Sequence, residues 1–333
     1  MVRRHIQLWL VLSVLMIVLT GCGQTAFQIS LVRTHQGLKE SRIQEDRGLF
    51  VSDKIAIIDV DGVLVNKQKR GLIRTGENPV SLFIEKLDKA ANDKSVKAVV
   101  LRLNSPGGTV TASDVMYHTL REFKRRTGKP VVTYVLGMGC SGAYYLACGS
   151  DGIVAQPTSV TGSIGTIFQT FSVAGTMEKI GMKAVAIKSG RMKDMASPLH
   201  DLGDEERQVL QGIIDDLYGQ FLKVVEDGRK SIDTQKLKTL ADGRVYTAEQ
   251  ALREGLIDRI GYLEDGIEWA KEKAGVQKAQ VVIYHRASDY APNAYGLTMA
   301  DADGFGSLVN IELPDWLNAG GPQFLYLWQP SVE

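Results

Sequence analysis

The sequence predicts an α/β protein with a largely parallel β-sheet and helices packed around it. Short β-branched runs alternate along the chain with longer segments whose apolar residues recur at helical spacing. That alternation is typical of parallel sheets. Two glycine-rich turns directly follow predicted strands, at the end where such sheets bind their ligands. The length of 333 residues allows one large or two modest domains.

The first half of the chain supplies most of the predicted sheet. Buried strands are expected at 54–60, 97–103, 130–136 and 152–156, because each is a short apolar run rich in β-branched residues. Asn78 and Pro79 are the N-cap and first residue of a helix between the first two strands. Thr111 is the expected cap of the next helix, and Gly128 its stop.

The second half continues with both element types. Helices are predicted at 174–181 and 204–228, and strands at 183–189 and 279–285. The tetrapeptide "TAEQ" at 247–250 is a capping box that opens a further helix, which Gly255 ends. From 288 to 323 the pattern fades, and the aromatic run "FLYLW" follows.

The N-terminus indicates export. Two arginines precede an apolar stretch at 8–19, which is shorter than the ~20 residues that span a bilayer. The sequence "LTGC" then resembles the lipobox of bacterial lipoproteins, with Cys22 as the lipidated residue. We therefore expect a signal peptide at 1–21, a tether at 22–53, and a body anchored to a membrane outside the cytoplasm. The alternative is an uncleaved membrane anchor.

Composition narrows the function. The formal net charge is +1 and no basic stripe stands out, which argues against nucleic acid as a partner. No cluster of cysteines and histidines with metal-ligand spacing is present, so neither a metal nor a cofactor is expected. Cys140 and Cys148 lie eight residues apart, about 12 Å along a helix, which is too far for a disulfide. Both are expected to be free thiols.

The two glycine-rich turns carry the candidate chemistry. "NSPGGTV" at 104–110 offers unpaired backbone N–H groups to an oxyanion or a phosphate, although such a motif by itself is more often a plain turn. Ser141 in "GMGCSGAYY" is either a helix cap or a nucleophile. The G-x-S-x-G elbow of α/β-hydrolases fails at Ala143, and neither His200 nor His285 has obvious support as a base.

A lysine is the other candidate base. "KSGRMKDMASP" at 188–198 contains Lys188 and Lys193, and spacing does not select between them. A lysine that acts as a base near neutral pH needs a pKa roughly two to three units below the ordinary value of about 10.4. Burial away from carboxylates achieves such a shift, and two methionines near Lys193 suit a dry pocket.

Five ordered blocks resemble the signal peptide peptidase A (protease IV) family in its short form with one catalytic unit. They are "NSPGGTV", "GMGCSGAYYLACGSD", "TGSIGTI", "KSGRMKD" and "DGRVYTAEQALREGLIDRIG", and the resemblance covers about 54–275. It implies a fold of the crotonase/Clp-protease type and a Ser/Lys dyad. On the matching positions Ser141 is the nucleophile, Lys193 the general base, Gly108 an oxyanion donor, and Ser163 a hydroxyl that orients the lysine amine.

Two positions depart from the family pattern. Cys140 stands where alanine is usual, and Ala143 where glycine is common. Both residues are small, so the resemblance to the family holds at these two positions. Cys140 remains a weaker alternative nucleophile, because the motif places the reactive hydroxyl one residue later.

The resemblance implies a membrane-associated serine endopeptidase. Its expected substrates are cleaved signal peptides or other short or unfolded peptides, and its expected assembly is a homo-oligomeric ring. The peptidase domain is assigned to 54–285 and an irregular tail to 286–333, with "FLYLW" docked on a neighbouring subunit or on its own globule. Alternatives are a catalytically silent peptide-binding scaffold of the same fold and a crotonase-like acyl-thioester enzyme, whose cytoplasmic substrates would not explain an export signal.

Overall fold

In the part of the chain that the structure describes, the main sheet has nine strands, most of them parallel to their neighbours. The computed structural model describes residues 37–46, 51–67, 77–286 and 323–328. The strands of this sheet are β1 (Lys39–Glu45), β2 (Lys54–Asp61), β3 (Val96–Ser105), β5 (Val131–Cys140), β6 (Gly152–Ala155), β7 (Val160–Gly162), β9 (Val245–Thr247), β10 (Arg259–Ile260) and β11 (Gln280–His285).

The order along the sheet is β1-β11-β2-β3-β5-β6-β10, and β7 pairs with both β5 and β9. All pairs from β11 to β10 are parallel, whereas β1 and β9 join antiparallel. The predicted α/β class with a largely parallel sheet is therefore confirmed.

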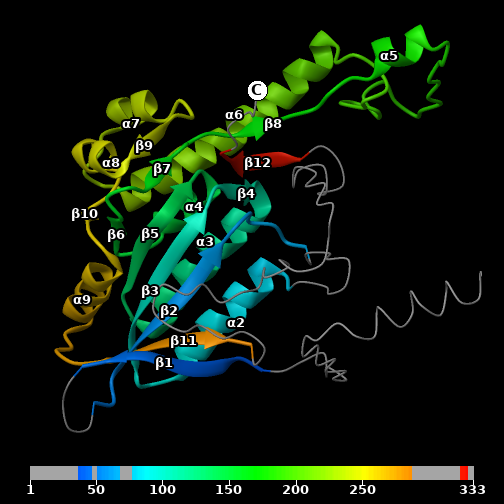
Figure 1. Ribbon diagram of the computed structural model, residues 1–333. Coiled ribbons are helices and arrows are strands. Elements are labelled where there is room, and N and C mark those ends of the chain that lie inside the picture. Colours follow the sequence, from blue (N-terminus) through cyan, green and yellow to red (C-terminus); the bar gives the residue numbers. More distant parts are fainter. Residues whose placement is uncertain (1–36, 47–50, 68–76, 287–322, 329–333) are drawn as a thin grey trace, which may run out of the picture. The chain divides into compact units, whose positions relative to one another are not determined.

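Helices cover both faces of this sheet (Figure 1). Their bounds are α2 (Pro79–Asn92), α3 (Val110–Thr127), α4 (Gly142–Ala147), α5 (Ala174–Lys179), α6 (Asp204–Gly228), α7 (Thr234–Leu240), α8 (Ala248–Glu254) and α9 (Leu263–Ala274). Alternate strand residues point to opposite faces. Ile55 and Ile57 of β2 therefore pack with α9, whereas Ile58 and Val60 belong to the larger core that α2, α3 and α4 complete.

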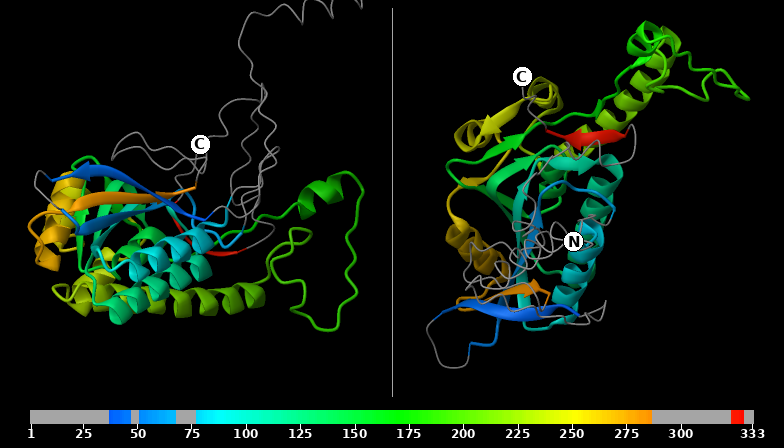
Figure 2. Two further views of the ribbon diagram at one scale, coloured as in Figure 1. Left: turned by 90° about the horizontal axis from the view of Figure 1, so that it is seen from below. Right: turned by 45° about the vertical axis from the view of Figure 1, so that its right-hand side comes forward.

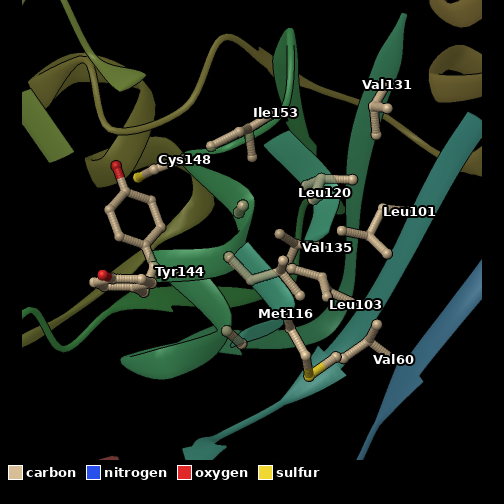
Figure 3. Close-up of a cluster of buried hydrophobic side chains, with 14 of the residues drawn as sticks. Val60, Leu101, Leu103, Met116, Leu120, Val131, Val135, Tyr144, Cys148 and Ile153 are labelled. Atoms are coloured by element: carbon tan, nitrogen blue, oxygen red, sulfur yellow. The ribbon is translucent and has the colours of Figure 1, made fainter. Parts of the chain in front are cut away.

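Figure 3 shows part of the larger core. Leu101 and Leu103 of β3 lie close to Met116 and Leu120 of α3, and Tyr144 brings α4 into the same cluster. These side chains are almost fully buried. The short α4, which follows the candidate nucleophile, is thus fixed by its packing and not by intrinsic helix stability.

Most predicted helix boundaries are confirmed. Asn78 accepts hydrogen bonds from the N–H groups of Val80 and Ser81 and caps α2. The helix at 204–228 has the predicted limits, and the "TAEQ" capping box opens α8. One cap is different, because α3 begins after Thr109, two residues before the predicted Thr111. Residues 107–109 form strand β4, which leaves Thr109 in the extended conformation that an N-cap requires.

A second, three-stranded sheet lies beside the first. It consists of β4 (Gly107–Thr109), β12 (Phe324–Leu327) and β8 (Ile167–Phe168), in the order β4-β12-β8. Both pairs are antiparallel. Figure 2 shows β12, coloured red, in this position. The "FLYLW" run therefore docks on its own globule, in a segment for which an irregular tail was expected.

Three further segments differ from the expectation. Strand β1 lies within the predicted tether. Strand β5 continues to Cys140, so the glycines before Ser141 are part of a strand and not of a loop. The predicted strand at 183–189 is wrong: no regular structure forms there, and every residue of the run is exposed. A β-branched run needs a partner strand to pair with, and the described part of this chain offers none at that place.

The predicted signal peptide at 1–21 and the predicted lipid site Cys22 lie outside the described residues. Within the described ranges, no helix combines the length and the apolar character needed to cross a membrane.

The packing of α9 on the sheet can be tested at Gly152. A Cβ atom there would lie 2.1 Å from the indole ring of Trp269, which covers the start of β6. We expect Gly152→Ala to push α9 away from the sheet and to lower the free energy of unfolding by about 1–3 kcal/mol. Urea-induced unfolding measures the change.

Gly212→Ala is the matched control. Gly212 lies inside α6, and a Cβ atom there would meet no atom within 4 Å. Replacing an exposed helical glycine should raise the free energy of unfolding by up to about 1 kcal/mol. Equal losses in the two variants would contradict the packing of Trp269 on Gly152.

Candidate active site

Ser141 sits in a strained and buried position at the end of β5. Its backbone has φ 53° and ψ −117°, which is unusual for a residue with a side chain, and it is 1% exposed. Its N–H donates to the Gly162 carbonyl at 2.7 Å, and its own carbonyl accepts from Tyr145 at 2.9 Å. Its hydroxyl makes no capping hydrogen bond to α4. The helix-cap interpretation of this serine is therefore not supported, and the hydroxyl is available for chemistry.

Ser163 directly follows the strand β7, which lies beside the end of β5. Strand β7 pairs in parallel with β5, and Cys140 is opposite Gly162. Ser141 and Ser163 are the next residues of the two chain segments, so they lie side by side. Ser163 also has a positive φ, 50°, and its N–H donates to the Arg244 carbonyl at 2.8 Å. The structure thus places Ser163 beside Ser141, and its contact with the lysine amine stays a prediction.

The N–H of Gly108 points toward β12, the strand that lies beside Ser141. The Gly107 carbonyl accepts from the Leu64 N–H at 2.8 Å, and the Thr109 N–H donates to the Leu64 carbonyl at 2.9 Å. Successive peptide groups of a strand point to opposite edges, so the N–H of Gly108 points away from Leu64 and toward β12. A Cβ atom on Gly108 would lie 2.0 Å from the Leu64 carbonyl oxygen, so only glycine fits here.

Strand β12 fills the slot that these groups face. Tyr326 is opposite Gly108 in the ladder, and the Trp328 N–H donates to the Pro106 carbonyl at 2.8 Å. The carbonyl oxygen of Tyr326 would be 2.0 Å from a Cβ atom on Gly107 and 3.1 Å from one on Gly142. A main-chain carbonyl of the chain itself therefore lies against Gly142, the residue after Ser141, and against Gly107 of β4.

The sequence analysis missed this strand. It noted "FLYLW" as an aromatic tail without placing it. The alternation of large side chains in the run was the available signal for a strand, but nothing local indicates which two edges it would join. Leu64, which bridges to Gly108, was also missed, because the apolar run at 63–65 is only three residues long and stands between Gly62 and Asn66, too short to predict a strand.

Lys193 is not brought to Ser141 within the chain. It lies in the segment 169–203 between β8 and α6, which reaches beyond the sheet in Figure 1 and contains α5. Its side chain is exposed, and among the described residues no hydrogen bond or ion pair of that side chain is found. Its neighbour Asp194 pairs with Lys188 instead, so the carboxylate is directed away from Lys193.

The histidines do not support a hydrolase triad. His200 uses both ring nitrogens on main-chain oxygens, of Asp201 at 2.9 Å and of Asp194 at 3.0 Å. These backbone hydrogen bonds raise the pKa of His200. His285 contacts the Ser41 hydroxyl at 2.7 Å and the Arg286 carbonyl. Neither histidine has a described contact with Ser141.

Asp194, His200 and Glu206 form the cluster that most resembles a metal site in the described residues, with ligand atoms within 4.8 Å of one another. However, both ring nitrogens of His200 are already hydrogen-bonded, and Asp194 already pairs with Lys188. The cluster is explained as an ion-pair network at the start of α6.

Cys140 is unsuited to act as the nucleophile. It is fully buried, and burial raises the pKa of its thiol to about 12. The reactive form of cysteine is the thiolate, which is almost absent at neutral pH in such surroundings. Cys148 is also buried, and burial raises the pKa of its thiol as well. Both are free thiols, as the sequence predicts.

Alkylation of the two thiols tests this conclusion. In the native protein at pH 8, a pKa of about 12 leaves on the order of one part in ten thousand as thiolate. We expect iodoacetamide to leave Cys140 and Cys148 unlabelled until urea unfolds the chain, as read by peptide mass spectrometry.

The raised pKa of the two thiols also predicts how the free energy of unfolding depends on pH. Unfolded thiols ionise from about pH 8.5, whereas the folded ones stay protonated to about 12. The unfolded state then binds fewer protons, so the free energy of unfolding should fall as pH rises above about 8.5. Cys148→Ala should weaken that fall. Rapid labelling of Cys140 in the native protein would contradict the buried, protonated thiol.

Comparisons with known proteins show the family and the fold of this chain. The family model described as peptidase family S49 matches residues 123–277, and the one described as Clp protease matches residues 74–161. The second match and the observed sheet confirm the Clp-protease-like fold.

Several relatives carry protease or peptidase names. "Putative signal peptide peptidase SppA" of Enterococcus faecium is 35% identical over 75% of this chain and 73% of its own length. "Protease 4" of Haemophilus influenzae is 33% identical over 67% of this chain and 35% of its own length. "Serine protease SPPA, chloroplastic" of Arabidopsis thaliana is 32% identical over 72% of this chain and 36% of its own length. With its serine at the end of β5 and its Clp-like fold, the chain belongs to the S49 peptidases, the family of signal peptide peptidase SppA and protease 4.

Proposed function

We propose that this protease is a serine endopeptidase in which Ser141 is the nucleophile and Lys193 the general base. Its substrates are extended peptides, such as cleaved signal peptides and other short or unfolded chains. The name of the Enterococcus faecium relative supports this substrate class. No metal or cofactor enters the proposal, because the nucleophile, the base and the oxyanion donors all come from the chain.

One observation carries the proposal: the slot beside Ser141 holds an extended strand whose carbonyl lies against Gly107 and Gly142. Strand β12 pairs with β4 on one side and with β8 on the other. A peptide substrate in the same place would gain main-chain hydrogen bonds on both edges. Those bonds do not depend on side chains, which suits an enzyme that degrades varied peptides. Strand β12 has to leave before such a peptide can bind.

The chemistry follows from this pose. The Ser141 hydroxyl attacks the carbonyl carbon of the scissile bond while its proton passes to the neutral amine of Lys193. The N–H groups of Gly108 and Gly142 hold the negative oxygen that develops. Protonated Lys193 then gives the proton to the leaving amine, and a water molecule, activated in the same way, releases the acyl group. Ser163 orients the lysine amine.

The exposure of Lys193 implies that a second copy of the chain completes the site. A lysine amine is neutral near pH 7 only in dry surroundings, and in the single chain Lys193 faces solvent. The segment that carries it also exposes Val185 and Ile187, which are 85% and 101% exposed. Apolar side chains held in water are typical of a surface that another molecule covers. In the proposed ring, this segment of one subunit packs on the Ser141 region of the next.

We propose further that the protease is held at a membrane by a lipid on Cys22, with its catalytic domain outside the cytoplasm. The support is the "LTGC" sequence after a short apolar run. Such an anchor would keep the site close to the peptides that signal-peptide cleavage leaves in the membrane.

Kinetics of single variants test the dyad. Ser141→Ala and Lys193→Ala should each lower kcat/KM on a fluorogenic signal-peptide sequence by at least about 10³-fold. Circular dichroism and thermal unfolding check that both variants are folded.

Lys183→Ala is the matched control, because Lys183 is an exposed lysine of the same segment. Its activity should stay within about twofold of wild type, as is usual for surface substitutions. If Lys193→Ala were as active as Lys183→Ala, Lys193 would not be the base. Full activity of Ser141→Ala would exclude the proposed nucleophile.

Mixing the two inactive variants tests the shared site. Coexpressed Ser141→Ala and Lys193→Ala chains should recover about a quarter of wild-type activity, because random assembly joins an intact serine to an intact lysine at one contact in four. A chain that carries both substitutions, Ser141→Ala/Lys193→Ala, is coexpressed with wild type as the control for expression level. No recovery in the mixture would place both residues of each site in one chain.

A further inference from the structure

Asp194, the residue next to Lys193, carries a carboxylate that would disable the proposed base if it were free. An ion pair between a carboxylate and a lysine stabilises the ammonium form at the expense of the neutral amine. The attraction grows as water is excluded, because the effective dielectric constant falls. In the covered site proposed above, a free Asp194 carboxylate would compete with Ser141 for the amine of Lys193.

The structure gives this carboxylate a different partner. Lys188 donates from Nζ to Oδ1 of Asp194, and the two side chains are 33% and 19% exposed. The other carboxylate oxygen, Oδ2, faces Nε2 of His200 at 3.7 Å. The hydrogen bond from Lys188 lowers the pKa of Asp194, so the carboxylate stays charged and keeps its partner. Both carboxylate oxygens are thus directed at groups other than the amine of Lys193.

The backbone of this turn does not depend on the ion pair. The carbonyl oxygen of Asp194 accepts from the Ser197 N–H at 2.9 Å and from Nε2 of His200 at 3.0 Å. The Lys193 N–H donates to the Gly190 carbonyl at 3.1 Å. Main-chain hydrogen bonds therefore fix where the base and its acidic neighbour lie, and the ion pair decides only what the carboxylate contacts.

The two lysines of "KSGRMKD" differ in the structure, although sequence spacing does not separate them. Lys188 is engaged with a carboxylate, whereas the side chain of Lys193 is exposed. Ion pairs this close to solvent contribute little to the free energy of unfolding. The consequence of the Lys188 pair is therefore sought at the neighbouring base and not in the stability of the fold.

We propose that Lys188 is a positioning residue of the protease: it holds the Asp194 carboxylate away from Lys193 and so keeps the amine of the base available to Ser141. The inference rests on the proposed function, because Lys188 acts through Lys193 as the general base. Lys188 itself contacts neither the substrate nor the reacting atoms. One lysine of the motif thus serves as the base, and the other as the partner of the acidic side chain beside it.

Kinetics of full-length Lys188→Met protein test the proposal, because methionine keeps an unbranched side chain and removes the charge. The freed carboxylate of Asp194 should pair with Lys193 and lower kcat on a fluorogenic signal-peptide sequence about 10–100-fold. KM should stay within about twofold, since no substrate contact is removed. The midpoint of thermal unfolding should change little. A kcat of Lys188→Met within threefold of wild type would overturn the proposal.

A second substitution separates this role from a purely structural one. In Lys188→Met/Asp194→Asn the carboxylate is gone, so a lysine at 188 has nothing left to hold. Asparagine has nearly the same shape and leaves the main-chain hydrogen bonds of the turn in place. The double variant should therefore recover to within about threefold of wild-type kcat, as should Lys188→Arg, which keeps the cation. A double variant as slow as Lys188→Met would overturn the proposal.

Lys236→Met is the matched control. Lys236 of α7 pairs with Glu254 of α8 at 3.0 Å, and the two side chains are 41% and 37% exposed. The same substitution therefore breaks a similarly exposed ion pair outside the segment that carries the base. Its kcat should stay within about twofold of wild type, as is usual for surface substitutions. Equal losses in Lys236→Met and Lys188→Met would contradict a specific effect on Lys193.

Comparison with Lys193→Ala separates this proposal from the proposed function. An inactive Lys193→Ala beside a fully active Lys188→Met refutes the positioning role and leaves the dyad standing. An active Lys193→Ala refutes the dyad and with it the positioning role. The pattern that supports both is an inactive Lys193→Ala, a slow Lys188→Met and a double variant with Asp194→Asn that is active again.

Discussion

The pairing of β5 with β7 is the interaction on which the site depends. Strand β5 continues past the main sheet to Cys140 and lies parallel to β7, with Cys140 opposite Gly162. The hydrogen bond from the Ser141 N–H to the Gly162 carbonyl, 2.7 Å long, then holds the serine at a positive φ of 53°. That backbone conformation is costly for a residue with a side chain. It is maintained because the surrounding strands and the buried α4 leave the serine no other place.

The second sheet holds an extended strand beside this serine. Gly108 is held by Leu64 on one edge of β4, and its N–H is therefore free to face the other edge, where β12 lies. The slot between β4 and β8 requires an extended chain, because an unpaired strand edge on either side would leave main-chain groups without partners. Main-chain pairing with β4 and β8 fixes where the carbonyl of such a chain lies.

Much of the fold and half of the candidate site could be predicted from the sequence, because both depend on local patterns. The buried runs gave β2, β3, β5 and β6, and caps such as Asn78 located helices. Ser141, Ser163 and Gly108 were identified by motifs, and strand pairing brings them together. β12 was missed because its partners are distant in sequence. The strand at 183–189 was predicted from β-branched residues, but strand formation also needs a partner, and the described chain supplies none there. For the same reason the sequence could name Lys193 but not place it.

The central claim is that the slot now filled by β12 is the substrate-binding site. A crystal structure of full-length Ser141→Ala protein bound to an extended peptide tests it most directly. The account predicts that the peptide replaces β12, runs antiparallel to β4, and places a carbonyl oxygen against Gly107 and Gly142. A peptide bound elsewhere, with β12 still paired to β4 and β8, would contradict it.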